Sequence, residues 1–168
     1  LGHVFIKNMI FPVLVYDKET GISRASFDNV GRARLLPTVN LSINHPFSKV
    51  WNVSLNGRMA YGMTEGVVDG EEVKNKGLMY GMFVSTGYRF PKSWRLNVNL
   101  NLDGPGLNIQ DRTNGMLYSS LSVSKDLVKD KLSFSAVLHN PTSKYMRRTR
   151  DSFGPDFLQY YERNDYFR

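Results

Sequence analysis

Large apolar residues and polar residues alternate along most of this chain. In the stretch Trp94–Leu102, every even position is apolar and every odd position between them is polar. Successive side chains on an extended strand point to opposite faces, so the pattern predicts a ribbon with one apolar face and one polar face. Asn has a low strand propensity. Its use at Asn97, Asn99 and Asn101 therefore indicates that one face of this strand must be polar.

The same alternation predicts further strands, and about eight strands are expected in all, with no amphipathic helix. The predicted strands are His3–Tyr16, Ile22–Phe27, Arg34–Asn44, Trp51–Met63, Leu78–Phe90, Trp94–Leu102, Leu117–Ser124 and Leu132–His139. Pro12 interrupts the first of them. A Pro within a strand predicts a sheet edge, a bulge or a break in the ladder, because it has no N–H to donate.

The predicted connections fall into two length classes. Compact turns are expected at 45–49, 90–93 and 125–131, and longer segments without strands at 64–76, 103–114 and 140–168. Further turn signals occur at 17–21 and 28–31. Outer-membrane barrels alternate short periplasmic turns with longer external loops, and their strands need roughly 9–11 residues to cross the bilayer. Trp51 and Trp94 stand at strand starts beside short turns, which is typical of interfacial aromatic girdles.

A soluble β-sandwich or jelly-roll binding module also alternates, with one face in its core and one in water. The polar face here carries mostly Asn, Ser, Thr and Gly and few of the Lys and Glu residues that cover soluble sheets. This composition and the turn lengths favour an all-β, antiparallel up-and-down transmembrane β-barrel. The soluble sandwich remains the alternative.

A barrel assigns each face of the strands to one environment. The residues predicted to face lipid or its interface are Trp51, Val53, Leu55, Tyr88, Trp94, Leu96, Val98, Leu100, Leu117, Leu121, Leu132 and Phe134. The residues predicted to face the lumen are Asn52, Ser54, Asn56, Asn97, Asn99 and Asn101.

Composition narrows the chemistry. The chain has 168 residues, a formal net charge of +7 and no Cys, which excludes disulfides, zinc–thiolate sites and a Cys nucleophile. His3, His45 and His139 lack metal-ligand spacing. Asp103 and Asp111 flank a Gly-containing loop that does not match a calcium-binding pattern, so a solvated loop is expected there. No catalytic motif is evident, and we expect neither an enzyme nor a bound cofactor or metal.

The segment Lys144–Arg168 is basic and aromatic. Interleaved basic and aromatic residues can bind nucleic acid. Because the preceding strands have a membrane pattern, an external surface facing lipid and anionic lipopolysaccharide is the preferred interpretation, and no nucleic-acid partner is expected.

Several short motifs resemble one family in their order and spacing. They are Asn29–Gly31, Trp51–Asn56, Pro91–Leu96, Lys125 with Lys129-Asp130-Lys131-Leu132, Asn140-Pro141, Lys144-Tyr145 and Ser152–Phe157. Over roughly residues 28–160 the chain resembles the C-terminal barrel region of TonB-dependent-receptor-like outer-membrane proteins of Gram-negative bacteria.

The resemblance implies that residues 1–168 are the C-terminal portion of a larger outer-membrane barrel, with no plug domain in this chain. The implied function is substrate uptake or outer-membrane complex assembly. A transporter of this kind would also require a plug domain and a TonB-type energy-coupling protein. No closing aromatic strand is evident after Phe167, which also fits a fragment.

Overall fold

The chain forms long antiparallel strands in a computed structural model that describes residues 2–128 and 131–166. The strands are β1 (Gly2–Asp17), β2 (Ile22–Pro46), β3 (Trp51–Val68), β4 (Glu71–Arg89), β5 (Trp94–Asp103), β6 (Asp111–Thr113), β7 (Met116–Val128), β8 (Leu132–His139), β9 (Tyr145–Phe153) and β10 (Leu158–Tyr166). No helix that could span a membrane is found in these described ranges.

The strands form a meander in two sheets. Seven strands follow the order β1-β2-β3-β4-β5-β7-β8, and three follow the order β10-β9-β6. All paired strands are antiparallel. Neither sheet closes on itself in the part of the chain that the structure describes.

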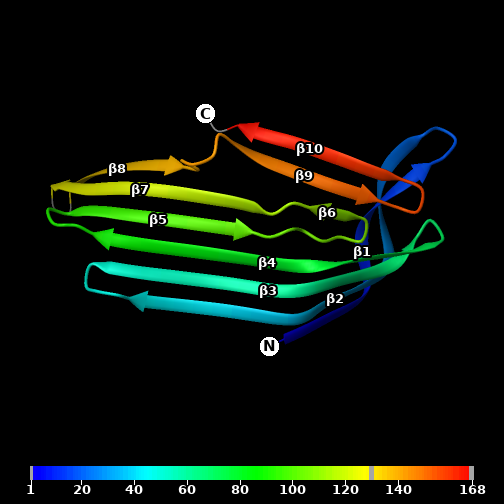
Figure 1. Ribbon diagram of the computed structural model, residues 1–168, viewed down its shortest axis with the longest axis horizontal. Helices are drawn as coiled ribbons and strands as arrows, with labels where there is room; N and C mark the ends of the chain where they lie inside the picture. Colours follow the sequence, from blue (N-terminus) through cyan, green and yellow to red (C-terminus); the bar gives the residue numbers. More distant parts are fainter. Residues whose placement is uncertain (1, 129–130, 167–168) are drawn as a thin grey trace.

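The small sheet continues the large one rather than packing over it. β6 leads into β7, and β8 leads into β9, so each pair forms one interrupted wall strand (Figure 1). Backbone hydrogen bonds from Asn140 to Ser119 and from Asn114 to Thr149 bridge the interruption. The ten strands thus occupy eight positions along one wall. The expected strands do not correspond to these positions one to one, because Ile22–Phe27 and Arg34–Asn44 are both parts of β2, and β9 and β10 were not expected.

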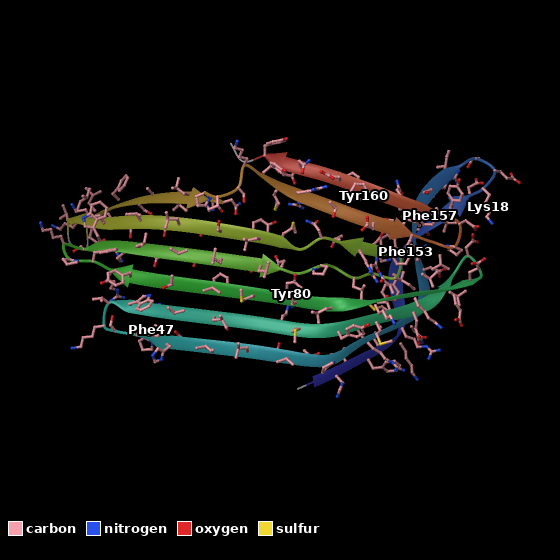
Figure 2. The ribbon with its side chains drawn as sticks, viewed as in Figure 1. Lys18, Phe47, Tyr80, Phe153, Phe157 and Tyr160 are labelled. Carbon is pink, nitrogen blue, oxygen red and sulfur yellow. The ribbon has the colours of Figure 1, made fainter. Side chains whose placement is uncertain are left out.

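The two ends of the wall differ in their connections. Turns 47–50 and 90–93 and the β7–β8 connection lie at one end, called here the short-turn end (Figure 1). The β1–β2 turn, the β3–β4 turn, loop 104–110 and the β9–β10 turn lie at the opposite end, the loop end. At the loop end, β1 and β2 curve toward the β9–β10 turn. There Lys18 pairs with Asp156 at 2.9 Å, and the rings of Tyr16 and Phe157 are 6.1 Å apart (Figure 2).

Three predicted connections were wrong. Segment 64–76 is not a loop: β3 and β4 run through it and are joined by Asp69-Gly70, whose φ angles are 53° and 81°. Such a two-residue turn with positive φ suits a hairpin, and the surrounding charged residues lie on strands that extend past the apolar region. β2 runs straight through the turn expected at 28–31. A Cβ at Gly31 would lie 2.2 Å from the Glu65 carbonyl oxygen, so this Gly permits close strand approach.

The third wrong expectation concerns the C-terminal segment, which contains β9 and β10 instead of irregular chain. Its charged residues obscured the alternation because they pair across the two strands on both faces. The turn expected at 125–131 is shorter, since β7 reaches Val128, and Lys129 and Asp130 lie outside the described residues. Pro12 lies within β1, an edge strand, as its sequence predicted.

The hydrophobic core is small and lies at the loop end. It comprises Phe11, Val13, Val68, Val73 and Ile109. Most large apolar residues of the wall are exposed instead, including Leu41 at 50%, Ile43 at 48% and Met59 at 46%. A soluble sandwich would bury such residues between two facing sheets. The arrangement therefore contradicts the sandwich alternative.

Candidate functional site

The register places the twelve predicted lipid-facing residues on one face of the wall. Directly paired residues of neighbouring strands share a face. Trp51 pairs with Tyr88, which pairs with Leu96, and Val98 pairs with Leu121. The remaining members join this face through pairs with other apolar positions or at two-residue spacing: Val53, Leu55, Trp94, Leu100, Leu117, Leu132 and Phe134. The structure thus brings them together, and their contact with lipid stays a prediction.

The six predicted lumen residues lie on the opposite, inner face. Asn52 and Asn97 both flank Gly87, and Ser54 and Asn99 both flank Ser85 across the ladder. Asn56 and Asn101 likewise flank Phe83.

Side-chain hydrogen bonds link this inner face across the strands. Ser85 Oγ donates to Asn99 Oδ1 at 2.7 Å, and Asn99 Nδ2 donates to Ser120 Oγ at 3.2 Å. A parallel bond runs from Ser42 Oγ to Asn56 Oδ1 at 2.7 Å. Short polar side chains therefore satisfy one another across much of this face, which also carries the exposed ring of Phe83.

Aromatic residues gather on the outer face near the short-turn end. Phe47 stacks on Trp51 with ring centroids 4.6 Å apart, and the Lys125 ammonium lies 4.9 Å from the Trp94 ring centroid (Figure 2 labels Phe47). The Trp51 indole N–H donates to Thr86 Oγ1 at 2.9 Å. Thr86 Oγ1 in turn donates to the Asn52 carbonyl at 3.1 Å. These bonds satisfy polar groups that the adjoining hydrocarbon region would otherwise leave unpaired.

The outer face has a second aromatic level on the same strands. This level is formed by Tyr61 on β3 and by Tyr80 on β4, which pairs with Met59. Between Trp51 and Tyr61, β3 presents only apolar residues and Gly57 on the outer face. The first outer charge on β4 beyond this stretch is Lys76, opposite Met63. The outer apolar region between these limits, called here the apolar belt, matches the roughly 9–11 residues of a tilted membrane-spanning strand.

Loop 104–110 folds onto the inner face instead of into solvent. A Cβ on Gly62 would lie 2.9 Å from a methyl of Leu107, so the absence of a side chain at this position lets Leu107 lie close against the wall. Ile109 is fully buried against Val68 and Val73. The expectation of a solvated loop between Asp103 and Asp111 was therefore wrong for its second half.

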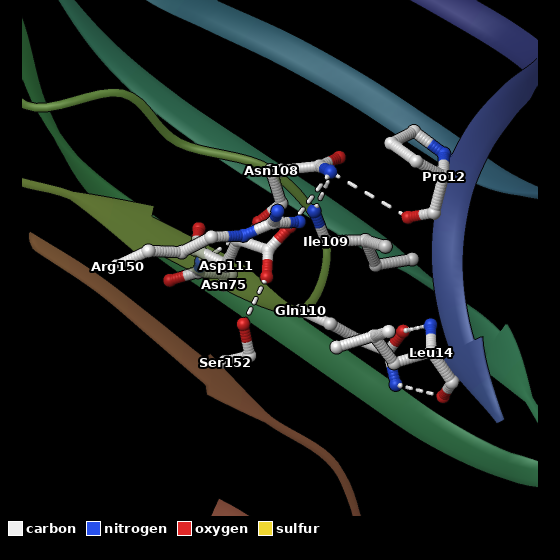
Figure 3. A network of polar contacts seen from close by, with 9 residues as sticks. All are labelled: Pro12, Leu14, Asn75, Asn108, Ile109, Gln110, Asp111, Arg150 and Ser152. Carbon is white, nitrogen blue, oxygen red and sulfur yellow. Dashed lines mark hydrogen bonds and ion pairs between the residues drawn. The ribbon is translucent and has the colours of Figure 1, made fainter. Parts of the chain in front are cut away.

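Asp111 anchors the end of this loop (Figure 3). It is 6% exposed. One carboxylate oxygen accepts a hydrogen bond from Ser152 Oγ at 2.6 Å, and the other accepts one from the Arg150 guanidinium at 2.5 Å. Asn75 Nδ2 donates to the Asn108 carbonyl at 2.7 Å and to the Asp111 carbonyl at 3.1 Å. Strands β4, β6 and β9 thus hold the loop through one polar network.

The electrostatics of this network favour a charged Asp111. Burial alone raises the pKa of the Asp111 carboxyl, but hydrogen bonds from Arg150 and Ser152 and the Arg150 charge outweigh it and hold the pKa below its usual value. The network lies beyond the apolar belt, because Asn75 stands between the exposed Lys74 and Lys76. Asp111 is therefore an ionised anchor at neutral pH.

Gln110 joins the loop to the free edge of β1. Its Nε2 donates to the Leu14 carbonyl at 3.2 Å, and its Oε1 accepts from the Leu14 N–H at 2.7 Å (Figure 3). The neighbouring Asn108 donates to the Pro12 carbonyl at 3.5 Å. A side-chain amide here replaces the ladder bonds of a strand, which covers the exposed edge that a sheet must protect.

The basic C-terminal segment is largely charge-compensated. Arg147 pairs with Glu162 at 2.7 Å, and Arg148 pairs with Asp165 at 3.2 Å. Arg150 is held by Asp111. Fewer unpaired positive charges of this segment are therefore available to bind anionic lipopolysaccharide than its composition indicated.

Sequence reasoning missed the Asp111 network and the Gln110 bridge. Their partners lie 33 to 96 residues away in the chain, so no local spacing marks them. Within the described ranges, no group of three or more His, Asp or Glu residues could hold a metal ion.

The sequence matches the outer membrane protein beta-barrel family over residues 1–168, and the chain belongs to this family. Membership makes it an outer-membrane β-barrel protein, in agreement with the fold and location predicted from the alternation. No curated protein and no solved structure matches the chain. The narrower resemblance to TonB-dependent receptors stays a prediction.

Proposed function

We propose that this chain forms part of the wall of a substrate-uptake barrel of the TonB-dependent-receptor type. The two-faced wall carries the proposal. Its inner face is lined by hydrogen-bonded Asn and Ser side chains, while its outer face is apolar. A polar lining suits hydrophilic solutes that pass along it.

The inward-folded loop also supports uptake rather than an open pore. A barrel wider than these eight wall positions would enclose an aqueous lumen that a plug must seal. Loop 104–110 already occupies the inner face of β3 and β4 at the loop end. In this proposal the loop narrows the external mouth, a plug domain outside this chain seals the lumen, and a TonB-type protein supplies energy.

Growth under nutrient limitation tests the proposal. A strain lacking the full-length protein is compared with its parent on media that each limit one large solute, namely iron chelate, cobalamin, peptide or glycan. Uptake predicts slower growth on one medium, restored by the wild-type gene only when the energy-coupling protein is present. Unchanged growth on every medium, together with loss of another protein from the outer-membrane fraction, would instead favour a role in complex assembly.

A control variant separates transport from folding. Asn99→Leu removes both inner-face hydrogen bonds of this residue and makes the lining apolar, whereas Leu96→Val keeps the outer face apolar. Both variants should reach the outer membrane in normal amounts. Only Asn99→Leu should slow uptake of a polar solute.

A further inference from the structure

A cluster of three basic residues lies on the outer face just past the apolar belt. Arg34 on β2 pairs directly with Met63 on β3, and Met63 pairs with Lys76 on β4. Phe5 on β1 pairs with Arg34 from the other side, and Lys7 follows two residues later. Neighbouring strands lie about 4.8 Å apart, so Arg34 and Lys76 are about 10 Å apart at the backbone.

Two of these cations lie over one exposed aromatic ring, and the third, Lys76, is paired with an exposed Met63. The Arg34 guanidinium lies 5.0 Å from the Phe5 ring centroid, and the Lys7 ammonium lies 5.6 Å from the same centroid. Phe5 is 47% exposed and Met63 is 39% exposed. Two like charges beside one ring repel each other, which favours an anion between them.

Nearby carboxylates do not neutralise this cluster in the described part of the chain. Glu65 pairs with Arg32 at 3.7 Å, and Glu72 pairs with Lys74 at 3.0 Å. Lys7, Arg34 and Lys76 form no ion pair with a described carboxylate. Their charges therefore remain available, in contrast to those of the paired arginines of β9.

The position of the cluster selects the partner. The apolar belt ends at Tyr61 and Leu78, and the cluster occupies the next levels toward the loop end. Counted from the apolar belt, the β3–β4 connection (62–77) is longer than the β4–β5 turn (90–93) at the opposite end. Outer-membrane barrels place their longer connections outside, so the loop end faces outward and the cluster lies at the headgroups of the outer leaflet. We propose that Lys7, Arg34 and Lys76 bind the phosphate groups of the anionic lipid of that leaflet, with Phe5 and Met63 against its acyl chains.

Binding of lipid A tests this assignment. The full-length protein in detergent is titrated with phosphorylated lipid A and with dephosphorylated lipid A, and bound lipid is measured by native mass spectrometry. Each basic residue near an anionic lipid surface contributes roughly a factor of five in affinity, so Lys7→Gln/Arg34→Gln/Lys76→Gln should bind phosphorylated lipid A roughly 100-fold more weakly. Its binding of the dephosphorylated lipid should not change.

The matched control removes the same charge at the opposite rim, through Lys49→Gln/Lys92→Gln/Lys131→Gln, and should bind as the wild type does. Arg34→Lys keeps a cation and should retain most of the binding, while Lys76→Gln alone should lose roughly fivefold. These single changes provide the test if the triple variant does not fold. Equal losses in both triple variants, equal losses for both lipids, or a Lys76→Gln variant that binds as the wild type does would overturn the proposal.

Discussion

Leu100→Arg places a charge at the middle of the apolar belt. Leu100 pairs with Val84 on one side and Ser119 on the other, and it is 37% exposed on the outer face. An Arg on the lipid face near the bilayer midplane costs about 2–4 kcal/mol. We therefore expect this substitution to lower the free energy of unfolding by about 3 kcal/mol.

Asn101→Arg is the matched control, because it introduces the same side chain one position further on the opposite face. Asn101 Nδ2 donates one hydrogen bond, to Asp103 Oδ2 at 3.0 Å. Losing such a bond costs about 0.5–1.5 kcal/mol. The nearby Asp103 can accept the new guanidinium, so the net cost should lie at the lower end of this range.

Denaturant titration of the full-length protein in phospholipid vesicles, followed by Trp fluorescence, measures both variants. The predicted difference is about 2 kcal/mol or more, with Leu100→Arg the less stable. Equal stabilities, or a less stable Asn101→Arg, would refute the assignment of the two faces.

Three further predictions concern the inward-folded loop. Asp111→Asn should lower the free energy of unfolding by about 1.5 kcal/mol, as measured by denaturant titration. This is the low end of the range for a hydrogen bond to a charged group, because its partner Arg150 is half exposed. The folded-state pKa of Asp111 lies below its unfolded value, so its contribution is complete above about pH 4 and should vanish as pH falls through the folded pKa. A stability difference between wild type and Asp111→Asn that grows on acidification would contradict this sign. Gln110→Leu removes both bonds to Leu14 and should speed amide exchange at Leu14 roughly tenfold; unchanged exchange would show that the edge is protected otherwise.

The alternation of apolar and polar residues predicted the strands of the wall, because this pattern is present within each strand by itself. The alternation at Trp94–Leu102 depends only on neighbouring residues, and the observed register keeps its two faces separate. Asp69-Gly70 also carried a hairpin signal, but the surrounding charges suggested a loop. Charged residues on strands outside a bilayer follow no apolar rule, which explains both this error and the missed β9 and β10.

The loop network and the basic cluster could not be predicted in the same way. Asp111 reads as a polar loop residue until β9 brings Arg150 and Ser152 beside it. Likewise, Arg34 and Lys76 become neighbours only through the register of β2, β3 and β4. Such sites depend on pairings between distant segments, for which single-residue spacing gives no signal.

Successive residues of β5 should face lipid and water in turn, because its even and odd positions lie on opposite faces of the wall. Single Cys residues at positions 97–102, each carrying a nitroxide, test it directly in the membrane-embedded full-length protein. The sequence of this chain contains no Cys that would compete for the label. Labels at 98, 100 and 102 should be relaxed mainly by oxygen, and those at 97, 99 and 101 mainly by a water-soluble nickel complex. A flat profile, or one with the two sets exchanged, would contradict it.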